Sequence, residues 1–174
     1  GIPFSERICG TAQTVDYYAN GKLQILFGAG TKLHLIDRLG RFVTGFPVDL
    51  KKEILLGPDV YDFNGTRRYN VMVLHKDNTI EMYNLKGQKP ASWNGISSAE
   101  IIRDLPERII VGGNTFWVVR TSVQTLIYPF SGGQPLNMSE GDKMALPDSD
   151  VKVVDGTAVE LQCYDGKTRI VKLK

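Results

Sequence analysis

Short runs of apolar residues recur along the chain at a period near 46 residues. Each repeat contains two such runs, and both are rich in the β-branched and aromatic residues that strands favour. The first runs span residues 23–27, 70–74 and 116–120, and the second runs span residues 33–36, 79–83 and 125–128. Short strands that repeat at this period are typical of β-propeller blades. We therefore predict an all-β protein.

Turn-forming residue pairs indicate four repeats. Asn-Gly, Gly-Asn and Asp-Gly tolerate the positive φ that two-residue type I′ hairpins require. Such pairs stand at residues 20–21, 64–65, 113–114 and 155–156. The strands expected before them span residues 15–18, 60–63, 108–111 and 151–154. We predict a single β-propeller-like domain over residues 1–174, with about four blades of mostly four antiparallel strands. The repeats are approximately residues 11–57, 58–106, 107–147 and 148–174.

The polarity of the strands indicates how they pack. Residues 71–74 and 116–119 are apolar almost throughout, which suits strands buried on both faces between stacked blades. The second run of a repeat alternates more clearly, with His34 and Glu81 on the side opposite the apolar residues. We expect that side of the strand to meet polar groups or solvent.

A turn followed by an aromatic residue is shared by the first two repeats. Asp37 and Asn84 each stand three residues before a glycine, and nine residues beyond them come Phe46 and Trp93. Asp or Asn at the first turn position hydrogen-bonds the backbone ahead of it. We interpret Asp37, and likewise Asp165 in the fourth repeat, as turn formers.

The strands expected at the two ends of the chain allow two interpretations of the propeller ring. The fourth repeat stops after a strand expected at residues 168–173, and residues 2–10 have no expected partner in the first repeat. Propellers are often closed by a blade built from both termini. The strand count allows such closure, and it equally allows a piece of a larger ring. Residues 97–104 are expected to form a loop with one helical turn.

Composition excludes several classes of protein. The chain has 174 residues and a net charge of +2, with Lys and Arg scattered among acids, so it lacks the basic stripe of a nucleic-acid surface. No apolar run approaches the ~18 residues that span a bilayer, so we expect no direct membrane insertion of this segment. Cys9 and Cys163 are expected to be two separate thiols, with a disulfide as the less favoured alternative.

No residue stands out as catalytic, cofactor-binding or metal-binding. His34 and His75 lie in different repeats, without a cysteine or carboxylate at the spacing of metal ligands. Neither histidine accompanies a Gly-x-Ser-x-Gly nucleophile motif. We therefore expect no cofactor and no metal, and we favour a non-catalytic protein over an enzyme.

Three residues are candidates for contacts with a ligand or partner. Trp93 lies in a predicted loop, and aromatic platforms with polar surroundings make good recognition surfaces. Arg67 and Arg68 follow a predicted hairpin and suit an anion. The structural interpretations, which we favour, are blade-to-blade packing for Trp93 and solvated turn charges for the two arginines.

The turn-and-aromatic pattern of residues 37–46 and 84–93 resembles the repeat of quinoprotein-like (PQQ-like) and WD40-like propellers. A narrower resemblance covers about residues 8–133. Residues 16–24, 32–38, 45–48 and 62–69 are similar to the C-terminal propeller repeats of uncharacterised cell-envelope proteins of Bacteroides-type bacteria. The resemblance implies a β-propeller at the C-terminal end of a longer polypeptide that is exported to the periplasm or the cell surface. It implies no activity.

The function expected from this architecture is binding. Radially arranged blades present variable loops on two rims, which can hold a partner without moving the scaffold. We expect a non-catalytic scaffold for a protein or glycan partner. The alternatives are part of a quinoprotein-like or glycan-processing enzyme, or repeats that only complete a larger propeller. Unpartnered end blades would favour a homodimer through open blade edges.

Overall fold

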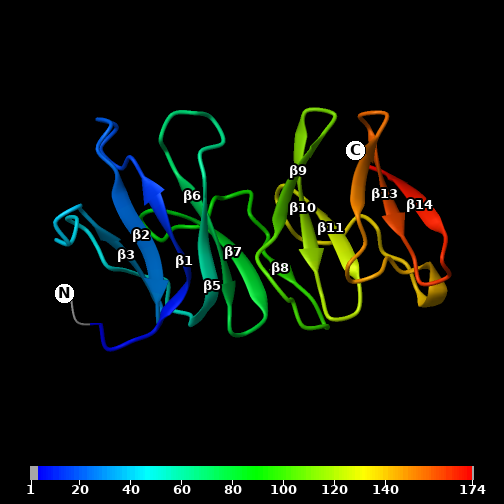
Figure 1. Ribbon diagram of the computed structural model, residues 1–174, viewed down its shortest axis with the longest axis horizontal. Coiled ribbons are helices and arrows are strands. Elements are labelled where there is room, and N and C mark those ends of the chain that lie inside the picture. The colour runs from blue at the N-terminus through cyan, green and yellow to red at the C-terminus, as the bar shows by residue number, and fades with distance from the viewer. Residues whose placement is uncertain (1–3, 174) are drawn as a thin grey trace. The chain divides into compact units, whose positions relative to one another are not determined.

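The computed structural model describes residues 4–173 and shows an all-β chain (Figure 1). Within this range the regular structure other than strands is one 3₁₀ turn, η1 (Gly141–Lys143). The strands are β1 (Ile8–Val15), β2 (Gln24–Ala29), β3 (Lys32–Ile36), β4 (Val48–Asp49), β5 (Ile54–Tyr61), β6 (Asn70–His75), β7 (Thr79–Asn84), β8 (Ile96–Ser97), β9 (Glu107–Val111), β10 (Asn114–Arg120), β11 (Thr125–Pro129), β12 (Val151–Val154), β13 (Ala158–Gln162) and β14 (Thr168–Lys172).

The strands form four antiparallel sheets of three or four strands, and the chain divides into two compact units. The first unit, up to Ala91, contains the sheet β1-β2-β3-β4 and the strands β5-β6-β7. The second unit, from Ser92 onward, contains the sheets β9-β10-β11 and β12-β13-β14. The strands expected from the apolar runs, β2, β3, β6, β7, β10 and β11, are confirmed. So is the all-β class.

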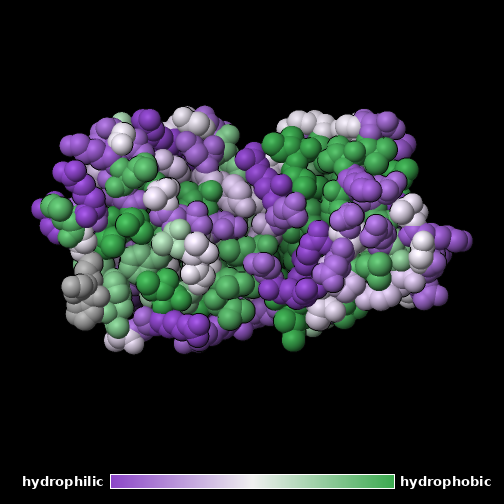
Figure 2. All heavy atoms as spheres, viewed as in Figure 1, coloured by the Kyte–Doolittle hydropathy of each residue, from purple (hydrophilic) through white to green (hydrophobic). Residues whose placement is uncertain are grey.

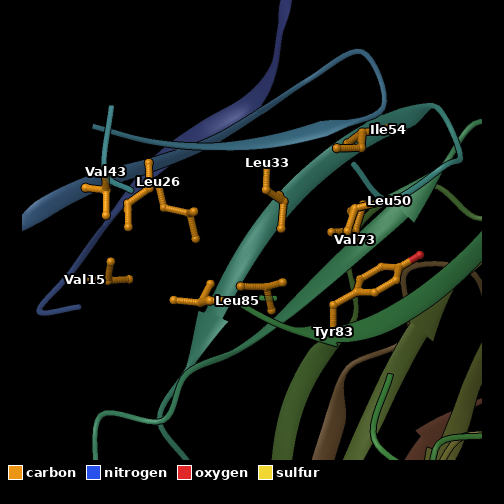
Figure 3. Close-up of a cluster of buried hydrophobic side chains, with 11 residues drawn as sticks. Val15, Leu26, Leu33, Val43, Leu50, Ile54, Val73, Tyr83 and Leu85 are labelled. Atoms are coloured by element: carbon orange, nitrogen blue, oxygen red, sulfur yellow. The ribbon is translucent and has the colours of Figure 1, made fainter. Parts of the chain in front are cut away.

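The core of the first unit lies between its two sheets. Leu26 on β2 and Leu35 on β3 are register partners, so their side chains share one face of the first sheet. Leu26 belongs to the same buried cluster as Val73 of β6 and Leu85, which follows β7, and all three are drawn in Figure 3. Leu26, Leu35 and Val73 are fully buried. Because burying a side chain of this size stabilises by about 1.5–3 kcal/mol, this cluster holds the two sheets of the unit together.

The core of the second unit is built in the same way. Phe116 of β10 and Ile127 of β11 are buried against Val159 and Leu161 of β13. Trp117, on the opposite face of β10 from Phe116, is also fully buried, and its indole Nε1 donates a hydrogen bond to the carbonyl of Phe130 at 3.0 Å. β10 is therefore covered on both faces, as its uninterrupted apolar sequence predicts.

The first two expected hairpins are wrong in size. β1 and β2 are joined by residues 16–23, and β5 and β6 by residues 62–69, so both connections have eight residues. In each loop an aspartate at the first position accepts hydrogen bonds from backbone amides further along, which organises the loop without a two-residue turn. Consequently residues 16–18 and 62–63, expected in strands, belong to these loops.

The third expected hairpin is displaced by one residue, and the fourth is longer than expected. Val111 of β9 pairs with Asn114 of β10, so Gly112 and Gly113 form the two-residue turn, with φ of 58° and 79°. Two positive φ values in succession define the type I′ turn, and glycine adopts them without steric cost. The connection between Val154 and Ala158 has three residues.

The beginning of the chain and residues 97–104 also differ from expectation. Ile8 and Cys9 belong to β1 and pair with Ala29 and Gly28, so this segment does have a partner in the first repeat. Gly10 continues β1, residues 4–7 are not in a strand, and residues 2–3 lie outside the described range. Residues 98–104 contain no helical turn. Ser98 and Glu100 instead hydrogen-bond each other, a local contact that competes with helix formation.

The side of β3 that carries His34 is buried among aromatic rings, although we expected it to meet polar groups or solvent. His34 is 8% exposed and stacks on Phe27, with ring centroids 5.2 Å apart and an interplanar angle of 12°. Phe4 and Phe42 enclose the same imidazole. The alternation of β3 is real, but an aromatic cluster covers the side that carries His34. At the matching position of β7, Glu81 does meet a polar group, because Lys89 Nζ lies 2.9 Å from its Oε1.

The predicted turn formers are confirmed. Asp37 Oδ1 accepts hydrogen bonds from the amides of Leu39 and Arg41 at 2.8 and 3.0 Å, and Asp165 Oδ1 accepts one from Lys167 at 3.0 Å. Hydrogen bonds from Arg169 and from the Lys167 amide lower the pKa of Asp165 to about 2.

Candidate ligand-binding groove

The three candidate residues lie in different compact units. Trp93 belongs to the second unit and is 9% exposed. Its ring lies against the backbone at Gly132, where an added Cβ would meet Trp93 Cη2 at 3.3 Å. Arg67 and Arg68 belong to the first unit, in the loop between β5 and β6, and both are exposed. The Trp93 side chain is therefore almost entirely buried by packing, whereas the two arginines are accessible to a ligand.

Arg67 and Arg68 line a groove with a volume of about 520 Å³, here called the loop groove. Three segments of the first unit build it: the β1–β2 loop, the β5–β6 loop with the start of β6, and the end of β7 with its following turn. Its lining residues are Tyr17, Arg67, Arg68, Tyr69, Asn70, Asn84, Leu85, Lys86 and Gln88. In Figure 2 the end of the first unit that carries the two long loops is mainly hydrophilic.

Asp16 links the two long loops by hydrogen bonds and an ion pair. Its carboxylate accepts hydrogen bonds from the amides of Asn20 and Gly21, both at 2.9 Å, and Arg67 Nε lies 3.3 Å from Oδ2. The Asp16 amide donates to the Tyr69 hydroxyl at 3.0 Å. Burial raises the pKa of Asp16, but the hydrogen bonds from Gly21 and Asn20 and the charge of Arg67 outweigh it and hold that pKa below its usual value.

Arg67 has an unusual backbone conformation that this network supports. Its φ is 60°, in the left-handed region that side-chain-bearing residues seldom occupy. Its amide donates to Asp62 Oδ2 at 3.0 Å while its guanidinium pairs with Asp16. Two aspartates from different loops therefore hold the backbone and the guanidinium of Arg67. The backbone position of the neighbouring Arg68 is fixed as a result.

The polar side chains on the opposite wall are ordered by the turn after β7. Asn84 Oδ1 accepts hydrogen bonds from the amides of Lys86 and Gln88 at 2.9 and 3.0 Å. Asn84 Nδ2 donates to Gln88 Oε1 at 3.0 Å. The bond from Asn84 Nδ2 orients the Gln88 carboxamide through its oxygen.

The loop groove has an excess of positive charge. Arg68 and Lys86 are exposed and make no ion pair within the described residues 4–173, while Arg67 is paired with Asp16. No Asp or Glu is among the lining residues. An anion that enters the groove could therefore pair with Arg68 and Lys86 without displacing a carboxylate.

Two other hollows have different chemistry. One of about 560 Å³ lies between the edges of β1 and β5, and its charges largely compensate each other, with Lys76 Nζ 3.3 Å from Glu53 Oε2. Cys9 lines it, and its thiol donates to the carbonyl of Ile54 at 3.3 Å. The other hollow, in the second unit, has about 250 Å³ and includes Glu100. Neither offers unpaired cations beside aromatic rings.

The histidines and cysteines occupy structural positions. His75 is fully buried, with Nε2 2.7 Å from the Tyr83 hydroxyl and Nδ1 3.1 Å from the carbonyl of Glu53. Cys9 and Cys163 are free thiols. In the described part of the chain, no three His, Cys, Asp or Glu residues are grouped so that they could hold a metal ion. None of the helices described there is long and apolar enough to cross a membrane.

Two solved structures are similar to this chain in fold. No family model and no curated protein matches the chain. A crystal structure of BBS1N in complex with ARL6DN is similar with a TM-score of 0.51 and 13% identity, over 98% of this chain and 54% of that one. The V. cholerae biofilm matrix protein Bap1 is similar with a TM-score of 0.53 and 14% identity, over 94% of this chain and 30% of that one. At these identities the likeness concerns the fold alone, and the chain spans about half and about a third of the two structures.

Sequence reasoning finds part of the groove. Arg67 and Arg68 are conspicuous as adjacent cations after a turn signal. Tyr17 and Lys86 carry no such signal, because they reach the groove from loops that are distant in the sequence.

Proposed function

We propose that this chain is a non-catalytic scaffold of the β-propeller type that binds a partner, protein or glycan, in the loop groove. The four antiparallel sheets correspond to blades, and their loops supply the binding residues. The observation that carries the proposal is the pair of exposed cations Arg68 and Lys86, which make no ion pair within residues 4–173 and lie on loops that hydrogen bonds hold in place. Rigid sheets that carry such loops bind at little conformational cost.

The sequence resemblance extends the proposal to the parent protein. We propose that the repeats belong to a longer polypeptide exported to the cell envelope, where a scaffold would hold extracytoplasmic partners. This part of the proposal rests on the sequence resemblance, which includes the turns at Asp37 and Asn84, each followed by an aromatic residue nine positions later. Detection of the full-length protein in isolated envelope fractions, rather than in the cytosolic fraction, tests the localisation.

The binding role is tested with charge reversal in the groove. The chain is labelled and incubated with immobilised panels of acidic and neutral glycans and of acidic and neutral peptides. The variant Arg68→Glu/Lys86→Glu should lose most binding to any member that the wild type retains. The matched control is Arg38→Glu, an exposed turn residue of the same unit that does not line the groove. Equal retention by wild type and the double variant would contradict the proposal.

A further inference from the structure

We propose that the loop groove recognises a carboxylate-bearing sugar of an acidic glycan, an inference that rests on the binding function proposed above. Its ligand class follows from three features of the lining: unpaired cations, two tyrosine rings and a set of carboxamides. Each feature matches one part of a sugar acid.

The cations suit the carboxylate. Arg68 presents a planar guanidinium that can bind both carboxylate oxygens, and Lys86 adds a compact positive charge from the opposite wall. Asp16, the nearest carboxylate in the network, does not line the groove and is already satisfied by two amides and by Arg67. An incoming carboxylate therefore has no internal competitor for Arg68 and Lys86.

The tyrosines suit the sugar ring. Tyr17 and Tyr69 are half-buried and pack against the hydrophobic core, so their rings are fixed before a ligand arrives. Tyr17 is braced further by edge contacts with Tyr18 and Phe46, with ring centroids 5.2 and 5.8 Å apart. Aromatic rings that are apolar on their faces and polar at the hydroxyl match the C–H faces and hydroxyl edges of a pyranose.

The carboxamides suit the hydroxyl groups. Asn70, Asn84 and Gln88 line the groove, and a carboxamide both donates and accepts hydrogen bonds, as a hydroxyl does. Asn70 and Asn84 are register partners at the ends of β6 and β7, so they are held by the sheet. Gln88 is oriented by its bond from Asn84. Neutral hydrogen-bonding groups at fixed positions select hydroxyl patterns, which a simple anion site does not need.

An acidic peptide fits the same surface less well. A peptide that adds a strand requires a free sheet edge, but β6 lies between β5 and β7 and has none. Anchoring of a peptide side chain requires an apolar pocket, but the lining offers Leu85 as its one aliphatic residue, and Leu85 is itself buried. The volume of about 520 Å³ lies in the range of small-ligand sites, which suits one or two sugar units.

The experiment measures binding by calorimetry with a short oligomer of hexuronic acid. The comparison ligands are the same oligomer with its carboxyl groups reduced to alcohols, a sulfated neutral oligomer and a poly-glutamate peptide. The proteins are the wild type, Arg68→Gln/Lys86→Gln and the control Arg38→Gln, each checked by thermal melting. We expect the reduced oligomer, the sulfated oligomer and the groove double variant each to bind about tenfold or more weakly, and Arg38→Gln to bind within about twofold of the wild type.

The other outcomes separate the inference from the proposed function. Equal affinity for the sulfated oligomer would overturn the assignment of a carboxylate, and equal affinity for the reduced oligomer would overturn the assignment of an anion. Groove-dependent binding of poly-glutamate with no binding of the uronate oligomer would overturn the sugar assignment and leave the scaffold function standing. Absence of binding to every member would overturn the inference and count against the proposed function as well.

Discussion

Asp16 and Asp62, which stand 46 positions apart in the sequence, organise their loops with the same hydrogen bonds. Each carboxylate accepts from the amides four and five positions later: Asn20 and Gly21 for Asp16, and Thr66 and Arg67 for Asp62. In both loops the third and fifth residues after the aspartate have positive φ. The two loops are therefore copies of one structural device, and they differ in that Arg67 reaches across to Asp16.

The ion pair between Arg67 and Asp16 predicts that removing Asp16 destabilises the protein more than removing Asp62 does. Asp16 is buried, and its loss would leave the amides of Asn20 and Gly21 and the guanidinium of Arg67 without their acceptor. Within residues 4–173, the Asp62 carboxylate accepts hydrogen bonds only from amides of its own loop. We expect Asp16→Ala to lower Tm by several degrees and by clearly more than Asp62→Ala, as measured by calorimetry at pH 7. Equal losses would contradict a linking role for Asp16.

The same two loops show what sequence can and cannot predict here. Strands such as β10 and β11 are encoded by their own residues, because β-branched and aromatic side chains favour extended backbone wherever they pack. The Asn-Gly pairs indicate turns, but loop length depends on which amides the aspartate side chain reaches, and Ala19 and Arg67 adopt positive φ without being glycine. The eight-residue loops therefore could not be sized from turn residues alone.

The candidate site illustrates a second limit of the sequence. Arg67 and Arg68 can be selected as adjacent cations, whereas Lys86 becomes relevant only after β5, β6 and β7 pair and bring its turn to the same groove. Similarly, alternation in β3 places His34 correctly on one face, but Phe4 and Phe42 come from outside the strand and cover that face. Local pattern gives the direction of a side chain, and tertiary packing decides what it meets.

The buried pair His75 and Tyr83 predicts a second stability effect. Tyr83→Phe would leave the imidazole Nε2 of a fully buried histidine without its partner at 2.7 Å. We expect a loss of about 1–3 kcal/mol in the free energy of unfolding, measured with urea. The matched control is Tyr164→Phe, which removes an exposed hydroxyl whose acceptor, the Val123 carbonyl, can bind water instead. Similar losses for the two variants would show that burial of the pair is unimportant.

The histidines predict how stability depends on pH. Burial lowers the pKa of His75 and of His34 below the usual value, so below about pH 6.5 the unfolded chain binds protons that the folded chain does not. Stability should therefore fall as the pH decreases from 7 to 5, by at most about 1.4 kcal/mol per pH unit for each histidine. The carboxylates with lowered pKa, such as Asp165, add their loss below about pH 4.

Replacement of His34 separates its share of this pH dependence. Its Nδ1 is buried without a hydrogen-bond partner within residues 4–173, and aromatic rings surround it. His34→Phe should remove that unsatisfied atom, leave stability at pH 7 unchanged or higher, and reduce the loss between pH 7 and 5 to that of His75 alone. Urea unfolding at each pH unit provides the measurement. An unchanged slope would mean that His34 is protonated equally in the folded and unfolded chains.

The packing around Trp93 predicts a difference between two glycines. Gly132 and Gly166 have nearly the same positive φ, 72° and 75°, so alanine is equally strained at both positions. At Gly132, however, an added Cβ would lie 2.5 Å from the carbonyl oxygen of Gly95 and 3.3 Å from Trp93, whereas at Gly166 it would meet nothing within 4 Å. We expect Gly166→Ala to cost about 1–2 kcal/mol and Gly132→Ala to cost distinctly more, with a change in Trp fluorescence, because the loop that holds Trp93 must move. Equal costs and an unchanged emission spectrum would show that the backbone at Gly132 does not hold Trp93 in place.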